Sequence, residues 1–284
     1  MLHAEASRTT WRPALLRAAH QLLDDDPKIF VDPLAVGLIP EASAETILAE
    51  TALIRSPRYE LLRSVFVLRA RYAEDRLAEA VGDGVAQYVI LGAGLDTFAY
   101  RQPGYARSLR IFEVDHPATQ ARKHQCLAAR GIPRPPNLRY VSGDFERDDL
   151  AQRLAAGGFD PRRAAFFSWL GVVQFLSAQA IEATLRFVAG LPRGSAIALS
   201  FAVPCDVLEG EHLELAEHSI ESCASRGEPW LSLYRPDELR AAALRCGFSE
   251  ADPLAPESAG ERYFSNRRDG LRAPRHEQLL TARV

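Results

Sequence analysis

Cysteine is scarce in this chain, and the few cysteines that occur are scattered. Cys126, Cys205, Cys223 and Cys246 form no Cys-x-x-Cys pair and show no regular spacing to histidines. A structural zinc site and a disulfide framework both need grouped cysteines, so the sequence predicts no disulfide framework and no metal site. A reducing compartment is the simplest environment for such a chain.

The sequence also lacks a long apolar run and a large charge of either sign. No stretch approaches the roughly 18 apolar residues of a membrane span, and the N-terminus has no apolar core of the signal-peptide type. The net charge of −3 and the isoelectric point near 6.2 show no excess of positive charge of the kind that binds nucleic acid or an anionic membrane. We expect a soluble, cytoplasmic protein without either partner. Its oligomeric state is left open, a homo-oligomer included.

The length and the apolar pattern fit one α/β domain with additional helices. The chain has 284 residues, of which 47% are hydrophobic and 25% charged, as in ordinary globular proteins. Apolar residues recur at helical spacing over 15–23, 42–54 and 61–81. We therefore expect residues 1–82 to form a helical N-terminal cap on a core of residues 83–284.

The core begins with alternating strands and helices, which indicate a parallel sheet with helices on both faces. Helices are also predicted over 211–225 and from Pro236 to Cys246. The first of these belongs to a lid insertion around 205–234, over the ligand edge of the sheet. The predicted strands are 86–91, 110–114, 138–141, 164–169 and 195–201.

The strongest local motif follows the first predicted strand, where Leu91 runs into Gly92-Ala93-Gly94. Glycines at this point let a nucleotide-like ligand approach the main chain at the carboxyl edge of the sheet. A purely structural turn explains the two glycines equally well. Position 97 is Thr, so the third glycine of the dinucleotide fingerprint is missing, which favours a cofactor without a pyrophosphate.

Acidic side chains follow the next two predicted strands. Asp115 ends the second strand, where a carboxylate can accept hydrogen bonds from both hydroxyls of a ribose. A solvated acid at a strand end is the alternative interpretation. Asp144 follows the third strand and is placed to accept the amino group of an adenine, with Phe145 covering the ring. A helix N-cap explains Asp144 nearly as well.

Five motifs, in order, resemble those of one family, the leucine carboxyl methyltransferase-like family of class I S-adenosylmethionine-dependent O-methyltransferases. The family includes polyketide-tailoring enzymes of secondary metabolism, and the similarity runs from about residue 9 to residue 265. The similar strings are Phe30-Val-Asp-Pro-Leu-Ala35, Leu68-Arg-Ala-Arg-Tyr-Ala-Glu-Asp75, Leu91-Gly-Ala-Gly-Leu-Asp-Thr-Phe-Ala-Tyr-Arg101, Phe112-Glu-Val-Asp-His-Pro117 and Phe166-Phe-Ser-Trp-Leu-Gly-Val172.

This resemblance implies a Rossmann-like, doubly wound, seven-stranded methyltransferase sheet with a helical N-terminal cap, and S-adenosyl-L-methionine as the cofactor. Many members read Trp-Glu-Gly where this chain has Leu170 between Trp and Gly, so one acidic contact to the cofactor is absent. The implied cofactor residues are Arg71 for the methionine carboxylate, Gly92 and Gly94 along the cofactor, Asp115 for the ribose, and Asp144 with Phe145 for the adenine.

Methyl transfer to oxygen is an in-line displacement, in which the enzyme holds the acceptor oxygen near the methyl carbon and excludes water. A carboxylate acceptor needs a cation to position it, whereas a hydroxyl acceptor needs a base. His212, Tyr234 and Arg235 in the predicted lid are the candidate catalytic residues. Apolar neighbours such as Leu213 and Trp230 would form a pocket wall suited to a small aromatic or polyketide-like acceptor, although core packing explains them equally well.

Three other functions remain open at this stage. One is a methyltransferase that acts on a protein C-terminal carboxylate. Another is a nicotinamide-dependent oxidoreductase, which would need a third glycine and a catalytic Tyr/Lys pair, although lysine occurs only at Lys28 and Lys123. The third is a non-catalytic nucleoside-binding protein that retains the fold.

Overall fold

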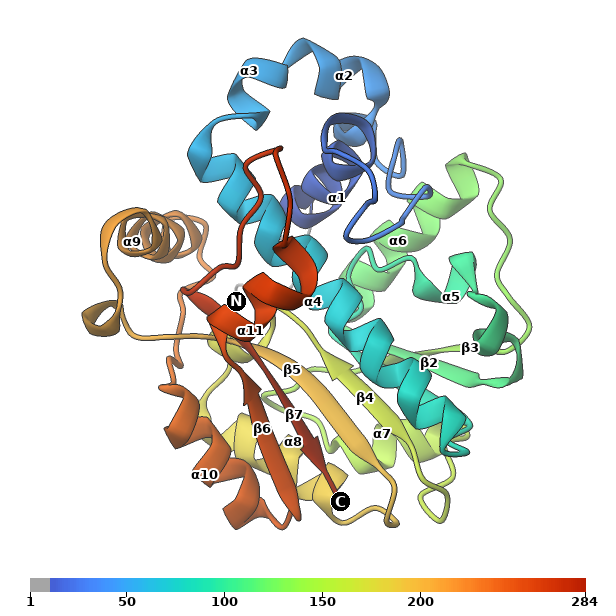
Figure 1. Cartoon of the computed structure of the whole chain (residues 1–284). Coiled ribbons are helices and arrows are strands. Elements are labelled where there is room, and N and C mark those ends of the chain that lie inside the picture. Colours follow the sequence, from blue (N-terminus) through green and yellow to red (C-terminus); the bar gives the residue numbers. More distant parts are fainter. Residues whose placement is uncertain (1–10) are drawn as a thin grey trace.

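A computed structural model describes residues 11–284 and contains a seven-stranded sheet in the order β3-β2-β1-β4-β5-β7-β6 (Figure 1). β1 to β5 are parallel to one another, while β7 is antiparallel to both β5 and β6. The strands are β1 (Gln87–Leu91), β2 (Arg110–Asp115), β3 (Leu138–Ser142), β4 (Phe166–Trp169), β5 (Ala196–Ala202), β6 (Glu250–Leu254) and β7 (Glu277–Arg283).

The doubly wound seven-stranded sheet expected from the sequence is confirmed. All five predicted strands form, each within two residues of its expected bounds. Every residue of β1, β4 and β5 is buried, as continuous apolar runs in a parallel sheet covered on both faces should be. The order of the strands reverses between β1 and β4, and this reversal creates the crevice in which ligands of such sheets bind.

Helices cover both faces of the sheet. α4 packs on one face together with α5 and α11, while α7, α8 and α10 pack on the other. The helices are α1 (Trp11–Leu23), α2 (Ala44–Ala49), α3 (Thr51–Ile54), α4 (Pro57–Gly82), α5 (Phe98–Arg101), α6 (Pro117–Ala129), α7 (Leu150–Ala156), α8 (Ala178–Ala189), α9 (Gly210–Ala224), α10 (Pro236–Cys246) and α11 (Pro256–Ala259). Short 3-10 or π turns are η1 (Pro40–Ala42), η2 (Gly104–Ser108), η3 (Val173–Phe175), η4 (Cys205–Val207) and η5 (Gly260–Phe264).

The N-terminal helices sit above the carboxyl edge of the sheet. α1 packs against the N-terminal half of α4, and their apolar side chains form a cluster that also takes in Leu95 beside the glycine motif and Leu215 of α9. The helix expected over 42–54 is interrupted, because α2 ends at Ala49 and α3 begins at Thr51. A division of the chain at residue 82 stays a prediction, and residues 1–10 of that cap lie outside the described residues.

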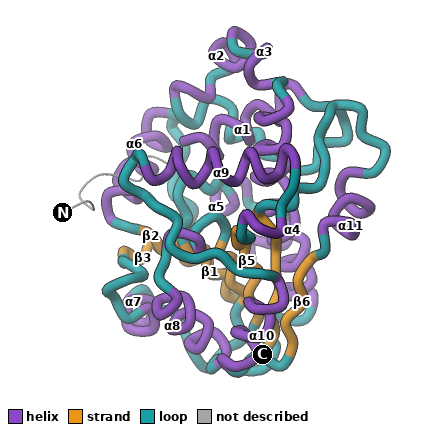
Figure 2. Tube along the Cα trace, turned by 90° about the vertical axis from the view of Figure 1, so that its left-hand side faces the viewer, coloured by secondary structure: helices purple, strands orange, loops and turns teal. Residues whose placement is uncertain are grey.

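α9 closes the same edge from a different side. In Figure 2 α9 crosses in front, at a height between α1 and the strands. Leu215 and Ala216 on this helix pack against the cap cluster and the sheet cluster respectively. The ends of β1, β2 and β4 therefore open into a space with the cap on one side and α9 with its following loop on another. None of the helices described for residues 11–284 combines the length and the apolar character required to cross a membrane.

Candidate functional site

A cavity of about 520 Å³ lies at the carboxyl edge of the sheet, under the cap and the segment after α9. Its volume is within the range of small-molecule and cofactor sites. It is lined by the ends of β1, β2 and β4, by α1 and α4 of the cap, and by Gly227, Glu228, Pro229 and Leu231. Gly92, Gly94, Asp115, Asp144 and Phe145, which the sequence predicts as ligand contacts, all line it.

The glycine motif forms the floor of the cavity in a main-chain conformation that side chains disfavour. Gly92 and Gly94 have φ angles of +69° and +47°. The amides of Gly92 and Ala93 both donate to the carbonyl of Val114 on β2, at 2.8 and 3.2 Å. The loop is thus held back against β2, which leaves its upper surface open to a ligand.

We expect Gly92→Ala to destabilise the protein more than Gly131→Ala does. Both glycines have positive φ, which costs an L-residue roughly 1–2 kcal/mol. A Cβ at Gly92 would also lie 2.3 Å from Cγ2 of Val172, whereas nothing lies within 4 Å of a Cβ at Gly131. Overpacking of this kind adds about 1–3 kcal/mol. Urea unfolding of both variants measures the difference, and equal losses would contradict the predicted clash.

Asp115 at the end of β2 has both carboxylate oxygens fixed by main-chain donors. Oδ2 accepts the amide of Gly94 at 2.5 Å, and Oδ1 accepts the amide of His116 at 2.7 Å. Burial raises the pKa of this carboxyl, and the two amides oppose that shift. Each oxygen keeps a free lone-pair direction, so the group can accept two further hydrogen bonds from a ligand diol.

Asp144 and Phe145 follow β3 and form the adjoining part of the cavity wall. Asp144 does not cap a helix, because the N-cap of α7 is Asp149, whose side chain accepts from the amide of Gln152. Oδ1 of Asp144 instead accepts the amide of Glu146 at 2.9 Å in a local turn. The ring of Phe145 rests 6.2 Å from that of Trp169 and presents an apolar surface to the cavity.

Arg71 does not reach this cavity. Its Nε donates to Asp75 at 2.8 Å, and its side chain faces a separate groove. Arg69, two residues earlier in α4, lines the cavity, because residues two apart in a helix point in different directions. A second guanidinium comes from α1, where Arg17 donates to the carbonyl of Leu95 at 2.5 Å.

Both cavity arginines have acidic partners. Nη1 of Arg69 lies 3.0 Å from Oε1 of Glu277 on β7, and Nε of Arg17 lies 3.6 Å from Oδ2 of the buried Asp32. The Leu-Arg-Ala-Arg string contained the signal for Arg69, but only the packing of α4 decides which arginine faces the ligand. Nothing in the sequence pointed to Arg17.

The predicted catalytic residues His212, Tyr234 and Arg235 do not line the cavity. His212 stacks loosely on His276, with ring centroids 6.0 Å apart, and Arg235 pairs with Asp206. The amide of Tyr234 donates to the carbonyl of Ala202 at the end of β5. None of these contacts reaches the cavity, so the predicted catalytic role receives no support from their position.

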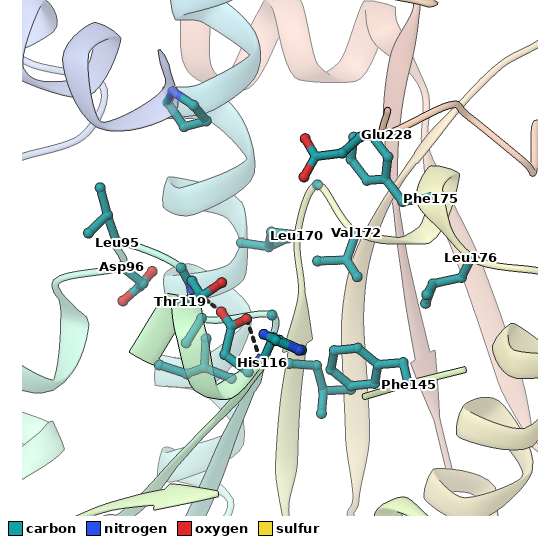
Figure 3. A pocket seen from close by; sticks show the side chains of 18 of the residues that line it. Leu95, Asp96, His116, Thr119, Phe145, Leu170, Val172, Phe175, Leu176 and Glu228 are labelled. Carbon is teal, nitrogen blue, oxygen red and sulfur yellow. Dashed lines mark hydrogen bonds between the residues drawn. The ribbon is translucent and has the colours of Figure 1, made fainter. Parts of the chain in front are cut away.

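Glu228, which no sequence motif indicated, enters the cavity from the loop after α9. Its Oε2 is buried and has no hydrogen-bond partner among residues 11–284. Leu170 stands where many family members have an acidic residue. It lines the cavity beside Val172 and Phe175 and gives it an apolar wall (Figure 3). Within the described part of the chain, no cluster of His, Cys, Asp and Glu is arranged to hold a metal ion.

Comparisons with known proteins identify relatives of this chain. The family model described as "Leucine carboxyl methyltransferase" matches residues 10–189. A Bacillus subtilis protein, YktD, named as a candidate S-adenosyl-L-methionine-dependent methyltransferase, is 31% identical over 290 residues, or 95% of each chain. A Saccharopolyspora erythraea protein named in the same way is 30% identical over 269 residues, covering 92% of this chain and 90% of the relative.

Two solved structures share the fold. A DUF574 family protein from Streptomyces avermitilis superposes with a TM-score of 0.60 at 18% identity, covering 99% of this chain and 98% of the other. A Thermobifida fusca protein, titled as a candidate methyltransferase, gives a TM-score of 0.56 at 17% identity, with 98% and 95% covered. At these identities the likeness concerns the architecture alone.

Proposed function

Because this chain belongs to the leucine carboxyl methyltransferase family, we propose that it is an S-adenosyl-L-methionine-dependent O-methyltransferase that acts on a carboxylate or hydroxyl of a small acceptor. The observation that carries the proposal is the grouping of Gly92, Gly94 and Asp115 on the wall of one cavity at the carboxyl edge of the sheet. When bound, S-adenosyl-L-methionine supplies an electrophilic methyl group on a sulfonium.

The residues present fit this cofactor. Asp115 has two lone-pair directions for the ribose hydroxyls, and Asp144 with Phe145 is suited to the amino group and ring of adenine. Arg69 and Arg17 replace Arg71 as the guanidinium groups available to the methionine carboxylate.

The charge of the cavity also suits a cationic sulfonium. Its two arginines both have acidic partners, while its carboxylates outnumber them. A cavity with excess negative charge concentrates cations and disfavours free anions. The lining carboxylates are Asp96, Asp115, Asp144, Glu146 and Glu228.

The remaining wall suits a small aromatic or polyketide-like acceptor. Leu170, Val172, Phe175, Leu176 and Leu231 line the cavity together. Aromatic rings gain from burial against such side chains and from edge contacts with Phe175. The predicted lid around 205–234 would help to exclude water from the acceptor during methyl transfer.

Titration calorimetry with S-adenosyl-L-methionine and with NAD tests the proposal directly. Binding of the first and not the second is expected, and the reverse would favour the nicotinamide-dependent oxidoreductase. Turnover with a panel of phenols, aromatic acids and a peptide with a free C-terminal leucine then identifies the acceptor. Methylation of the peptide alone would point to a protein carboxyl methyltransferase, and binding without any product to a nucleoside-binding protein.

Arg69 and Arg71, both on α4, offer a matched test of the cofactor site. Arg69→Met should weaken binding of S-adenosyl-L-methionine about 10–100-fold, since a hydrogen bond between charged groups contributes about 1.5–3 kcal/mol. Arg71→Met should change the affinity less than about twofold, because Arg71 faces another groove. Calorimetry of both variants decides the question; a larger loss in Arg71→Met would restore the role inferred from the family resemblance.

Several finer expectations stay predictions. They are the cytoplasmic location, a place in secondary metabolism, the homo-oligomer, and the boundary between a cap of residues 1–82 and a core with a lid around 205–234. The absence of nucleic-acid and membrane partners belongs with them.

A further inference from the structure

We infer that the acceptor is a hydroxyl compound and that Glu228 is the catalytic base that takes its proton. This inference rests on the proposed methyltransferase function and makes the acceptor more specific. It starts from a carboxylate oxygen, Oε2 of Glu228, that is buried and unpartnered within residues 11–284. A buried carboxylate oxygen without a partner is costly, so its place in a cavity wall indicates that a ligand donor satisfies it.

The other four carboxylates of the cavity are already engaged. Asp96 accepts the amide of Phe98 at 2.7 Å, and Asp115 and Asp144 accept main-chain amides. Both oxygens of Glu146 accept from Ser177, at 2.7 and 2.9 Å. Glu228 alone among these five accepts no hydrogen bond from the described residues, so its carboxylate remains available for an acceptor.

His116 is the only other cavity side chain, among the described residues, of a type that often serves as a base. Its Nδ1 accepts the amide of Ala118 at 3.3 Å and caps the N-terminus of α6. It also follows Asp115, which places it at the ribose end of the proposed cofactor. His116 therefore caps the N-terminus of α6 and forms part of the cavity wall. We assign the role of base to Glu228 instead.

Glu228 lies on the acceptor side of the cavity. In Figure 3 its carboxylate is beside the ring of Phe175, and in that view Leu170 and Val172 lie between it and His116. The neighbouring side chains are apolar, which strengthens a hydrogen bond from a hydroxyl to the carboxylate. An acceptor ring packed on Phe175 and Leu231 would bring a ring hydroxyl within reach of this group.

The loop that carries Glu228 is firmly anchored. The amides of Leu231 and Ser232 both donate to the carbonyl of Gln174 in η3, at 2.6 and 3.2 Å, and Oγ of Ser232 donates to the carbonyl of Leu176 at 2.6 Å. Trp230 meets the ring of Phe175 edge-on, with centroids 6.5 Å apart. The main chain beside Glu228 is thus held in place before the acceptor binds, as the support of a catalytic base should be.

Charge argues against a carboxylate at the reacting position. An ionised acceptor would meet the negative charge of Glu228. The two cavity arginines, Arg69 and Arg17, are assigned to the methionine carboxylate of the cofactor and already have acidic partners. Arg12 and Arg226, which have no acidic partner among residues 11–284, line a smaller adjoining pocket and not the main cavity. That pocket can hold an anionic substituent remote from the reacting hydroxyl.

The reaction balances with these groups. The acceptor oxygen attacks the methyl carbon, an O–C bond forms, and the C–S bond breaks with its electron pair going to sulfur. The hydroxyl proton passes to the carboxylate of Glu228 and from there to water. A positioned base contributes about 10²–10⁴-fold to such a step when the hydroxyl is un-ionised.

The test compares Glu228→Gln with the parent on phenols of graded acidity, from unsubstituted phenol to 4-nitrophenol. Calorimetry with S-adenosyl-L-methionine comes first, and both proteins should bind it; failure of the parent to bind would sink the proposed function itself. The variant should then lose about 10²–10⁴-fold in kcat on phenol but less than about tenfold on 4-nitrophenol, which is largely ionised at pH 8 and needs no base. Glu221→Gln, an exposed change on α9, is the control and should match the parent.

A second readout identifies the reacting group. 4-Hydroxybenzoate carries both a hydroxyl and a carboxylate, and the parent should convert it to the ether, 4-methoxybenzoate. Formation of the methyl ester would overturn the inference. So would an equal loss of rate on every phenol in Glu228→Gln, which would indicate a structural role, or a parent that binds the cofactor and methylates no hydroxyl in the series.

Discussion

Replacing Asp115 by alanine should weaken the binding of S-adenosyl-L-methionine by about 100-fold or more. The carboxylate is fixed by the amides of Gly94 and His116, so its two remaining lone-pair directions are set before the ligand arrives. Each hydrogen bond from a ribose hydroxyl to a charged acceptor contributes about 1.5–3 kcal/mol, and 1.4 kcal/mol is a factor of ten in affinity. Titration calorimetry measures the loss.

Two further variants show whether the effect is local. Asp115→Asn keeps one oxygen and loses the charge, so it should fall between alanine and the parent. Asp237→Ala, an exposed change on α10, should leave the affinity unaltered. Because alanine at 115 also leaves two amides without their acceptor, unfolding curves must accompany the titrations. A variant that stays folded and binds as tightly as the parent would remove the ribose assignment.

The parallel strands could be predicted because strands buried on both faces of a sheet have continuous apolar sequences. The final two strands could not. β6 contains Glu250, Asp252 and Pro253, and the first two are exposed at the edge of the sheet, where apolar alternation is not required. β7 pairs antiparallel with β5 although many residues separate them. Only the tertiary fold brings that segment into the sheet, and no local pattern records it.

The residues of the site also divide into those that the sequence could predict and those that depend on tertiary packing. Gly92, Gly94 and Asp115 lie at the ends of strands or directly after them. Because the carboxyl ends of parallel strands meet at one edge of the sheet, the fold class determines their positions. Arg69 and Glu228 lie on a helix and a loop whose orientations depend on packing. Helical periodicity alone cannot say whether Arg69 or Arg71 faces the ligand, because the two residues flank the buried stripe of α4.

The predicted lid around α9 shows most clearly which features the sequence could not predict. Its helix α9 agrees with the predicted range to within one residue at each end, yet the catalytic residues expected on the lid point elsewhere. The residue that enters the cavity, Glu228, lies in the loop that the chain forms after the helix. Its position depends on hydrogen bonds to Gln174, far away in the sequence. Such a contact leaves no periodic signal.

Arg63→Met should lower the free energy of unfolding by about 3–5 kcal/mol, the largest stability effect we expect in the cap. Arg63 is fully buried in α4, and its Nε and Nη2 donate to the two oxygens of Asp24 at 3.0 and 2.9 Å. His20 adds a contact to the same carboxylate at 2.8 Å, and Arg63 also donates to the carbonyl of Ile54. Methionine fills most of the volume but leaves a buried carboxylate without its cation, which costs about 3–5 kcal/mol.

Controls separate the ion pair from packing. Arg71→Met on the same helix removes a guanidinium whose side chain is 47% exposed, and it should cost less than about 1 kcal/mol. Adding Asp24→Asn to Arg63→Met should recover part of the loss, because the uncompensated charge disappears. Urea unfolding measures all three, and equal losses in the two arginine variants would contradict the prediction. Since α1 carries Arg17 into the cavity, a cap loosened at Arg63 should also bind S-adenosyl-L-methionine more weakly, which links the stability of the cap to the ligand site.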